Sequence, residues 1–156
     1  MPKRWKDEQE LLDSLSEALV KAMSMFPKRI VKVDELVHEY HMPLSHIQIL
    51  ALVEDRSRSI GQLSTLLGIA KPNITPLVDT LNSRGLVERI RSEQDRRIVL
   101  VHILPAGEAC LRDIRASVSQ QLTAWPESLS RGDIRELLNA LNTITQTIGK
   151  MEQSGR

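Results

Sequence analysis

The 156-residue sequence predicts a mainly α-helical protein with one small β-hairpin. Apolar residues recur at helical spacing through most of the chain. Between residues 86 and 104 the spacing changes to an alternation of about two, which is typical of strands. Two short helical segments around a small-residue turn stand immediately before that stretch. This order predicts a helix-turn-helix followed by a hairpin.

Three helices are expected before this central block. A long amphipathic helix is predicted from about Trp5 to Phe26, and Pro27 is expected to interrupt it. A shorter helix follows and should end before Pro43. The third runs over about residues 45–54 and is apolar over most of its circumference. We therefore expect the third helix to be buried centrally.

The helix-turn-helix is predicted from its start and stop signals. Ser59 is suited to cap a short helix, and Gly68 is suited to close it in the left-handed conformation. The next helix is expected to begin near residue 71 or near residue 73, and the sequence is compatible with either start. It places apolar residues at i, i+3, i+4 and i+7 and should stop at Gly85.

The hairpin and two further helices complete the chain. A polar turn at residues 92–95 separates the two strands, and basic residues surround the turn. Pro105 is expected to start a long helix. Ser130 and Asp133 have the spacing of a capping box for a last helix. The first and last helices carry apolar stripes that either pack on each other or join a second chain.

Charge is distributed unevenly although the net charge is only +1. Residues 56–97 hold eight basic and four acidic side chains, so they carry +4 and the rest of the chain carries −3. This suggests a localised anionic partner. The single cysteine, Cys110, excludes an intramolecular disulfide, and no apolar run reaches membrane-spanning length. We therefore expect a cytoplasmic protein that does not interact with membranes.

Several motifs stand in a characteristic order: LSHIQIL at 44–50, ITPLVDTL at 74–81, RGLVER at 84–89, Asp-Arg-Arg at 95–97 and LPAG at 104–107. As a set they resemble the MarR (multiple-antibiotic-resistance regulator) family of winged helix-turn-helix transcription factors. The resemblance covers roughly residues 30–145. Two departures are Ala70, where a capping serine or threonine is frequent, and Pro105, where a threonine is common.

The resemblance implies a homodimer whose terminal helices interlock, which would account for the apolar stripes. It divides the chain into N-terminal dimerisation helices at 1–43, a winged helix-turn-helix domain at 44–104 and C-terminal dimerisation helices at 105–156. Two symmetric copies would place their recognition helices about 34 Å apart on one face of the DNA. The expected partner is therefore double-stranded DNA with an imperfectly palindromic operator, and repression is the family's commoner mode.

The helix after the turn is the expected recognition helix. Asparagine pairs bidentately with adenine, and threonine bonds either kind of base edge or touches a thymine methyl. Small polar residues also occur on helix faces that are simply solvated. If the helix begins near residue 71, Pro76 lies inside it and a kink is expected. The candidate DNA-binding residues here are Lys71, Asn73, Thr75, Pro76, Asp79, Thr80 and Arg84.

The hairpin is the expected wing, since arginine is attracted to narrow minor grooves. The resemblance assigns Asp95 to holding the loop, Arg96 to phosphates or the groove, and Arg97 to linking the wing to Asp79. The alternative is a solvated, salt-bridged hairpin. Weaker candidates, some for phosphate contacts and others as ordinary surface charge, are Arg56, Arg58, Lys71, Arg84 and Arg89. The candidate DNA-binding residues of the wing are Arg89, Arg91, Asp95, Arg96 and Arg97.

Family members commonly respond to small phenolic or lipophilic ligands, and some sense oxidants or zinc. Cys110 is interpreted as a small buried residue, although a redox-responsive regulator of the same fold is an alternative. The candidate zinc ligands His38, Glu39, His41 and His46 lie close in sequence, but the long helix adds no histidine to complete a site, only Glu108 and Cys110. No metal or cofactor is therefore expected, and a metal-responsive regulator of the same fold is an alternative. The candidate ligand-pocket residues are Phe26, Tyr40, His41, His46 and Trp125.

Two further classes of function were weighed. Serine, histidine and aspartate are present, but no nucleophile elbow, phosphate-binding loop or paired-carboxylate pattern organises them, so an enzyme is not expected. A winged-helix module that binds a protein or single-stranded RNA without binding duplex DNA is the other alternative. No aromatic residue that would stack on unpaired bases lies between 71 and 97, which disfavours RNA.

Overall fold

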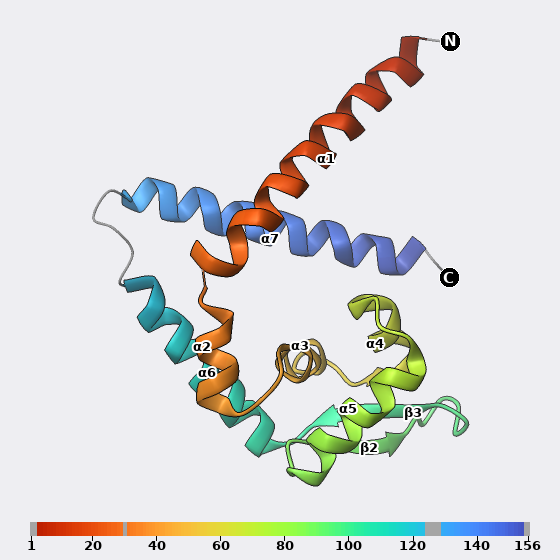
Figure 1. Cartoon of the computed structure of the whole chain (residues 1–156). Coiled ribbons are helices and arrows are strands. Elements are labelled where there is room, and N and C mark those ends of the chain that lie inside the picture. The colour runs from red at the N-terminus through yellow and green to blue at the C-terminus, as the bar shows by residue number, and fades with distance from the viewer. Residues whose placement is uncertain (1–2, 30, 124–128, 155–156) are drawn as a thin grey trace.

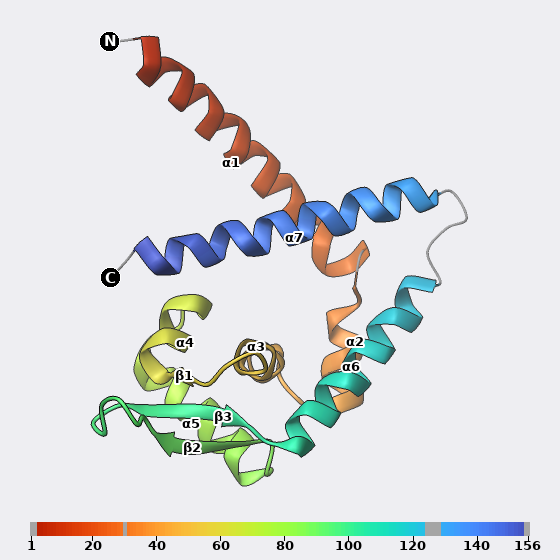
Figure 2. The same ribbon diagram turned by 180° about the vertical axis from the view of Figure 1, so that it is seen from behind.

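The computed structural model describes residues 3–29, 31–123 and 129–154 (Figure 1). The central helices and the sheet form a lobe at one end, and α1 and α7 lie at the other, with α2 and α6 between them (Figures 1 and 2). No described helix is long and apolar enough to cross a membrane. The elements in chain order are α1 (Lys3–Arg29), α2 (Val33–Tyr40), α3 (Leu44–Val53), β1 (Arg58–Ser59), α4 (Ile60–Leu67), α5 (Lys71–Ser83), β2 (Val87–Arg91), β3 (Val99–Ile103), α6 (Pro105–Thr123) and α7 (Arg131–Ser154).

The core of the lobe forms around α3, as expected. Ile49, Leu50 and Val53 of α3 are fully buried. They belong to one cluster with apolar side chains of α4, α5, the sheet and α6. Burying such side chains stabilises the fold by about 1.5 to 3 kcal/mol each. The buried face of α5 is therefore packed against this core.

The first helix of the helix-turn-helix, α4, begins and ends at the predicted capping residues. The Ser59 Oγ accepts a hydrogen bond from the Gln62 N–H at 3.2 Å, and the Gln62 Oε1 accepts one from the Ser59 N–H at 2.8 Å. This reciprocal capping box fixes the start of α4. Gly68 ends α4 at φ +64°, a left-handed conformation that suits glycine. Helix α5 begins at Lys71. The residue before it, Ala70, has no side-chain oxygen that could cap the helix.

The hairpin is confirmed, but it is part of a three-stranded sheet in the described residues. The strand order is β1-β3-β2 and both pairings are antiparallel. Strand β1 contains only Arg58 and Ser59, which pair with Val101 and Leu100. A strand of two residues is too short to show an alternating pattern, so β1 could not be predicted from periodicity.

One expectation for the terminal helices was wrong. Pro27 does not end the first helix, which continues to Arg29. The proline lies in the last turn, where its missing N–H removes a single hydrogen bond. The predicted capping box of α7 is confirmed, since the Asp133 N–H donates to the Ser130 Oγ at 3.1 Å and the Ser130 N–H to the Asp133 Oδ2 at 2.7 Å. Ile134, Leu138, Ile144 and Ile148 of α7 are exposed within this chain, as are large apolar side chains of α1, so their apolar stripes are available to join a second chain.

Candidate nucleic-acid interface

Helix α5 buries one face and exposes the other as the helical spacing predicts. Ile74, Val78 and Leu81 are fully buried and anchor the helix in the core. The opposite face is solvent-exposed and carries small polar groups. It includes Asn73, Thr75, Pro76, Asp79 and Thr80, with Lys71 at the start of the helix and Arg84 just after its end.

The start of α5 settles the position of Pro76. Because the helix begins at Lys71, Pro76 lies inside it rather than in its first turn. The hydroxyls of Thr75 and Thr80 each donate a hydrogen bond to a backbone carbonyl one helical turn earlier. Thr75 Oγ1 donates to the Lys71 carbonyl at 3.4 Å and Thr80 Oγ1 to the Pro76 carbonyl at 3.0 Å. Both hydroxyl protons are thus engaged, and each oxygen keeps lone pairs with which to accept a hydrogen bond.

The loop between β2 and β3 is closed by its own hydrogen bonds. The Ile98 N–H donates to the Asp95 carbonyl and the Ser92 N–H to the Ile98 carbonyl, each at 2.9 Å. The Asp95 carboxylate accepts from the Arg97 backbone N–H at 3.0 Å and from its Nε at 3.2 Å. Asp95 therefore holds the loop, in agreement with the expectation. The Arg97 side chain is 91% exposed.

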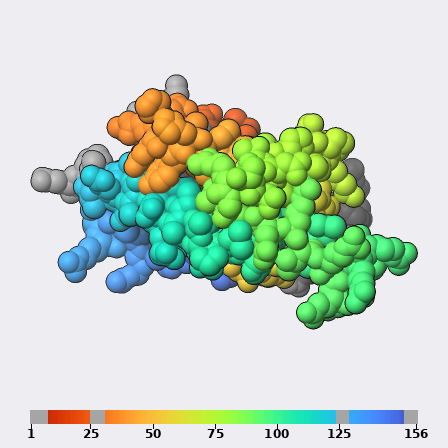
Figure 3. Space-filling view, turned by 90° about the horizontal axis from the view of Figure 1, so that it is seen from below, coloured from red at the N-terminus to blue at the C-terminus, as the bar shows by residue number. Residues whose placement is uncertain are grey.

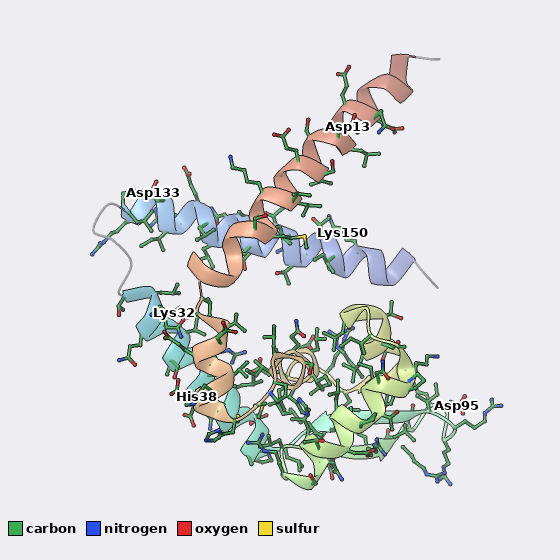
Figure 4. The ribbon with its side chains drawn as sticks, in the orientation of Figure 1. Asp13, Lys32, His38, Asp95, Asp133 and Lys150 are labelled. Atoms are coloured by element: carbon green, nitrogen blue, oxygen red, sulfur yellow. The ribbon has the colours of Figure 1, made fainter. Side chains whose placement is uncertain are left out.

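The wing projects from the lobe beside α5. Figure 3 shows the wing (green) protruding at the edge of the molecule in the view that displays α5, and Figure 4 places Asp95 in the projecting loop. Arg91 and Arg96 line a shallow depression in this loop together with Ser92 and Glu93. Arg91 and Arg96 thus lie at the projecting end of the hairpin.

An ion pair joins the wing to α5, but the arginine is not the expected one. Arg89 Nη2 lies 2.7 Å from Asp79 Oδ1, whereas Arg97 pairs with Asp95. The strand register explains the difference. Arg89 stands opposite the buried Val101, so it shares the face of the sheet that packs on α5. Arg97 lies outside the strands, in the loop, which directs its side chain elsewhere.

Two of the remaining arginines have structural partners. Arg58 is buried and its Nε donates to the Leu52 carbonyl at 2.5 Å, so the suggestion that it contacts phosphate is wrong. The sequence did not predict the burial of Arg58 because it did not predict strand β1, to which Arg58 belongs. Arg84 Nη1 donates to the His41 carbonyl at 3.4 Å and connects the end of α5 to the end of α2.

The predicted ligand-pocket residues fall into two groups. Tyr40 is half-buried and its hydroxyl lies 2.8 Å from the Ser117 Oγ of α6, while His46 is buried in α3 and His41 ends α2. These three lie where α2 meets the lobe. The side chain of Phe26 and the whole of Trp125 lie outside the described residues.

Two observations on the described residues concern metal and redox chemistry. They contain no group of three or more histidine, cysteine or acidic side chains placed to hold a metal ion. Cys110 is half-buried, and its burial raises the pKa of the thiol above the ordinary range. A raised pKa leaves less of the reactive thiolate at neutral pH.

A helix-turn-helix anchored by buried apolar residues, with an exposed polar face on its second helix and followed by an arginine-bearing hairpin, defines a winged helix-turn-helix protein of the DNA-binding type. A family model described as "MarR family" matches residues 41–98. The chain belongs to the MarR family of DNA-binding transcriptional regulators.

Individual relatives agree with this assignment. The chain is 30% identical over 101 residues to the uncharacterised regulator YsmB of Bacillus subtilis, covering 64% of this chain and 69% of YsmB. It is 28% identical over 102 residues to the transcriptional repressor MprA of Escherichia coli K12, covering 65% and 58% of the two chains.

Solved structures give the same fold. The transcriptional repressor CouR, bound to a 23-mer DNA duplex, superposes with a TM-score of 0.63 and 30% identity over 84% of this chain and 94% of CouR. A structure of CouR from Rhodococcus jostii RHA1 with p-coumaroyl-CoA superposes with a TM-score of 0.61 and 21% identity over 86% and 93%. The second likeness supports the fold alone.

Proposed function

We propose that the chain binds a palindromic operator as a homodimer, with α5 in the major groove and the wing in the adjacent minor groove. The observation that carries this proposal is the Asp79–Arg89 ion pair. It holds the exposed face of α5 and the arginine-bearing wing as one surface. Such a surface matches the way in which winged helices approach duplex DNA.

Asn73, Thr75 and Thr80 are the proposed base-reading residues of α5. The Asn73 amide both donates and accepts, as an adenine edge requires. Since the protons of both threonine hydroxyls bond to the helix backbone, the oxygens are left to accept hydrogen bonds from the amino groups of adenine or cytosine. Lys71 and Arg84 would contact phosphates and so position the helix without reading sequence.

The wing arginines supply the second contact. Arg91, Arg96 and Arg97 would enter or flank the minor groove, where a narrow A·T tract concentrates negative potential. Arg89 has a positioning role, because its guanidinium is bound to Asp79. That pairing also neutralises a carboxylate that would otherwise repel the phosphates.

The second copy of the chain would cover the terminal helices. Large apolar side chains of α1 and α7 are 51 to 72% exposed, in rows that follow the helical repeat. Patches of this kind mark association surfaces. The rows are Leu11, Leu12, Leu15, Leu19, Val20 and Met23 on α1, and Ile134, Leu138, Ile144 and Ile148 on α7.

Sedimentation equilibrium tests the dimer. The wild-type chain should be a dimer at micromolar concentration, and Ile148→Asp should dissociate it by placing a charge in the apolar row. Asn139→Asp adds the same charge to the opposite side of α7 and should leave the dimer intact. A wild-type monomer, or equal effects of both substitutions, would contradict the interlocked dimer.

In this function the protein acts by binding, without catalysis. It represses transcription by occupying an operator, as the MprA and CouR descriptions suggest. A small lipophilic or phenolic ligand would release it by binding near Tyr40, His41 and His46, where α2 meets the lobe. A shift of that junction would change the spacing of the two recognition helices, on which binding of both half-sites depends.

The DNA-binding claim is tested by selecting a duplex from random DNA and measuring binding by fluorescence anisotropy. Wild-type protein should select a palindrome. Thr75→Ala should change the preferred base at one position of each half-site, with a discrimination loss of about 1 to 3 kcal/mol. Thr143→Ala removes a hydroxyl that bonds to its own helix in the same way on α7 and should leave the preference unchanged. If a folded dimer selects no duplex, the winged helix is instead a protein-interaction surface.

A further inference from the structure

His46 is an unusual ionisable residue in the described part of the chain. It lies in the first turn of α3 and is only 5% exposed. Neither its Nδ1 nor its Nε2 has a hydrogen-bond partner among the described protein groups. Buried polar groups are normally hydrogen-bonded, and a buried charge without a partner is far more costly still. The fold therefore requires His46 to be neutral.

The elements packed against α3 carry the acids Asp79 on α5 and Glu108 and Asp113 on α6, but the charge that acts on His46 is that of Arg84. Helix α4 contains no ionisable side chain. His102 of β3 is exposed and its Nδ1 lies 3.0 Å from the Ser57 Oγ. Helix α6 places Cys110 against the core, and the end of α5 contributes Arg84, whose charge acts on both His46 and Cys110. The charged group that faces His46 is thus positive.

Arg84 also has a structural position of its own. It is the C-cap of α5, and its guanidinium donates to the carbonyl of His41, the left-handed residue (φ 46°) that ends α2. Arg84 thereby connects the recognition helix to the helix leading toward the terminal region. Burial first, and the Arg84 charge second, lower the pKa of His46 below its ordinary value of 6.5.

We propose that His46 and Arg84 form an acid-sensitive junction that releases the recognition helix when His46 gains a proton. Protonation places a buried, unpartnered imidazolium beside the Arg84 guanidinium. The two positive charges repel, and the protonated form is favoured only where α3 and the end of α5 separate. Operator affinity then falls in mild acid, an effect that depends on the proposed DNA-binding function.

The direction of the pH effect follows from linkage. The folded chain binds the His46 proton less readily than the unfolded chain. The stability that neutral His46 contributes is therefore fully present above the unfolded pKa, near 6.5, and is lost as the pH falls below it toward the folded pKa. Each unit between the two pKa values makes unfolding about tenfold more favourable at the acid end.

The test measures urea unfolding and operator binding between pH 8 and pH 5 at constant ionic strength. Wild-type protein should lose stability and several-fold of its affinity below pH 6.5. His46→Gln cannot be protonated and should lose distinctly less of both. His102→Gln, which removes the exposed histidine of β3, is the matched control. This variant should lose as much stability and operator affinity in acid as the wild-type protein. Equal pH dependence in His46→Gln and wild type would overturn the proposal.

Two further readouts keep the proposal testable. If His46→Gln fails to fold, the NMR titration of His46 in the wild-type protein decides: a pKa below 6.5 supports the proposal and a pKa at or above 6.5 overturns it. If the wild-type protein binds no duplex at any pH, the proposed function fails, and the unfolding and NMR measurements still decide the role of His46.

Discussion

The Arg89 guanidinium of β2 lies 2.7 Å from the Asp79 carboxylate of α5, and this ion pair connects the wing to the recognition helix. Both side chains are more than a third exposed, so water screens the pair. Exposed pairs of this kind contribute up to about 1 kcal/mol to stability. We therefore expect the pair to matter mainly because it fixes how α5 and the wing, the two proposed DNA-binding elements, lie relative to each other.

Breaking this pair should impair DNA binding more than folding. We expect Arg89→Gln to weaken operator binding several-fold while lowering the free energy of unfolding by less than about 1 kcal/mol. Because both residues serve one contact, Asp79→Asn combined with Arg89→Gln should cost little more affinity than Arg89→Gln alone. Anisotropy and urea unfolding of the four proteins measure this cycle, and fully additive losses would show that the two residues act independently.

Gly107 should tolerate no side chain, because α6 approaches the end of the hairpin closely there. A Cβ at this position would lie 2.2 Å from the Leu86 carbonyl oxygen and 2.8 Å from the Ile103 Cγ1. Gly107→Ala should destabilise the protein by about 1 to 3 kcal/mol through overpacking.

Gly149 of α7 provides the matched control. A Cβ there meets no atom within 4 Å, so Gly149→Ala should be neutral or should stabilise by up to about 1 kcal/mol through helix propensity. Thermal or urea unfolding of both variants compares them. If Gly107→Ala is as stable as the wild type, the close packing of α6 on Leu86 is wrong.

Cys110 should react slowly while the protein is folded. Its thiol is half-buried and its pKa is raised, mainly by burial, against a smaller opposing effect of Arg84. A chromogenic disulfide reagent at pH 8 should label the folded protein on the order of tenfold more slowly than the protein unfolded in urea. Equal rates in the two states would instead favour a redox-responsive regulator.

Local signals in the sequence were sufficient for much of the fold. Ser59 and Gly68 bound a helix whose capping chemistry needs only neighbouring residues, and the apolar spacing of α5 identified the exposed face. Strand β1 was missed because two residues have no measurable period. Pro27 was misjudged because a proline removes one backbone hydrogen bond without always ending a helix, and α1 continues for two residues beyond it.

The sequence predicted the exposed face of α5 and the hairpin, but not the pairings between their side chains. Asp95 was correctly expected to hold the wing loop through contacts two residues away. The arginine that pairs with Asp79 depends on strand register, which places Arg89 on the face toward α5 and leaves Arg97 outside the strands. Burial of Arg58 depends likewise on long-range pairing. Such relationships are set by tertiary structure and leave no local signal.

The salt dependence of operator binding tests the central claim most directly. Log affinity should fall linearly with log salt concentration, with a slope of about −0.9 for each phosphate contacted. Arg97→Ala should reduce that slope by about one such unit, whereas Arg112→Ala, which removes an exposed arginine from α6, should leave it unchanged. A slope near zero, or the same change in slope for both variants, would contradict DNA binding through α5 and the wing.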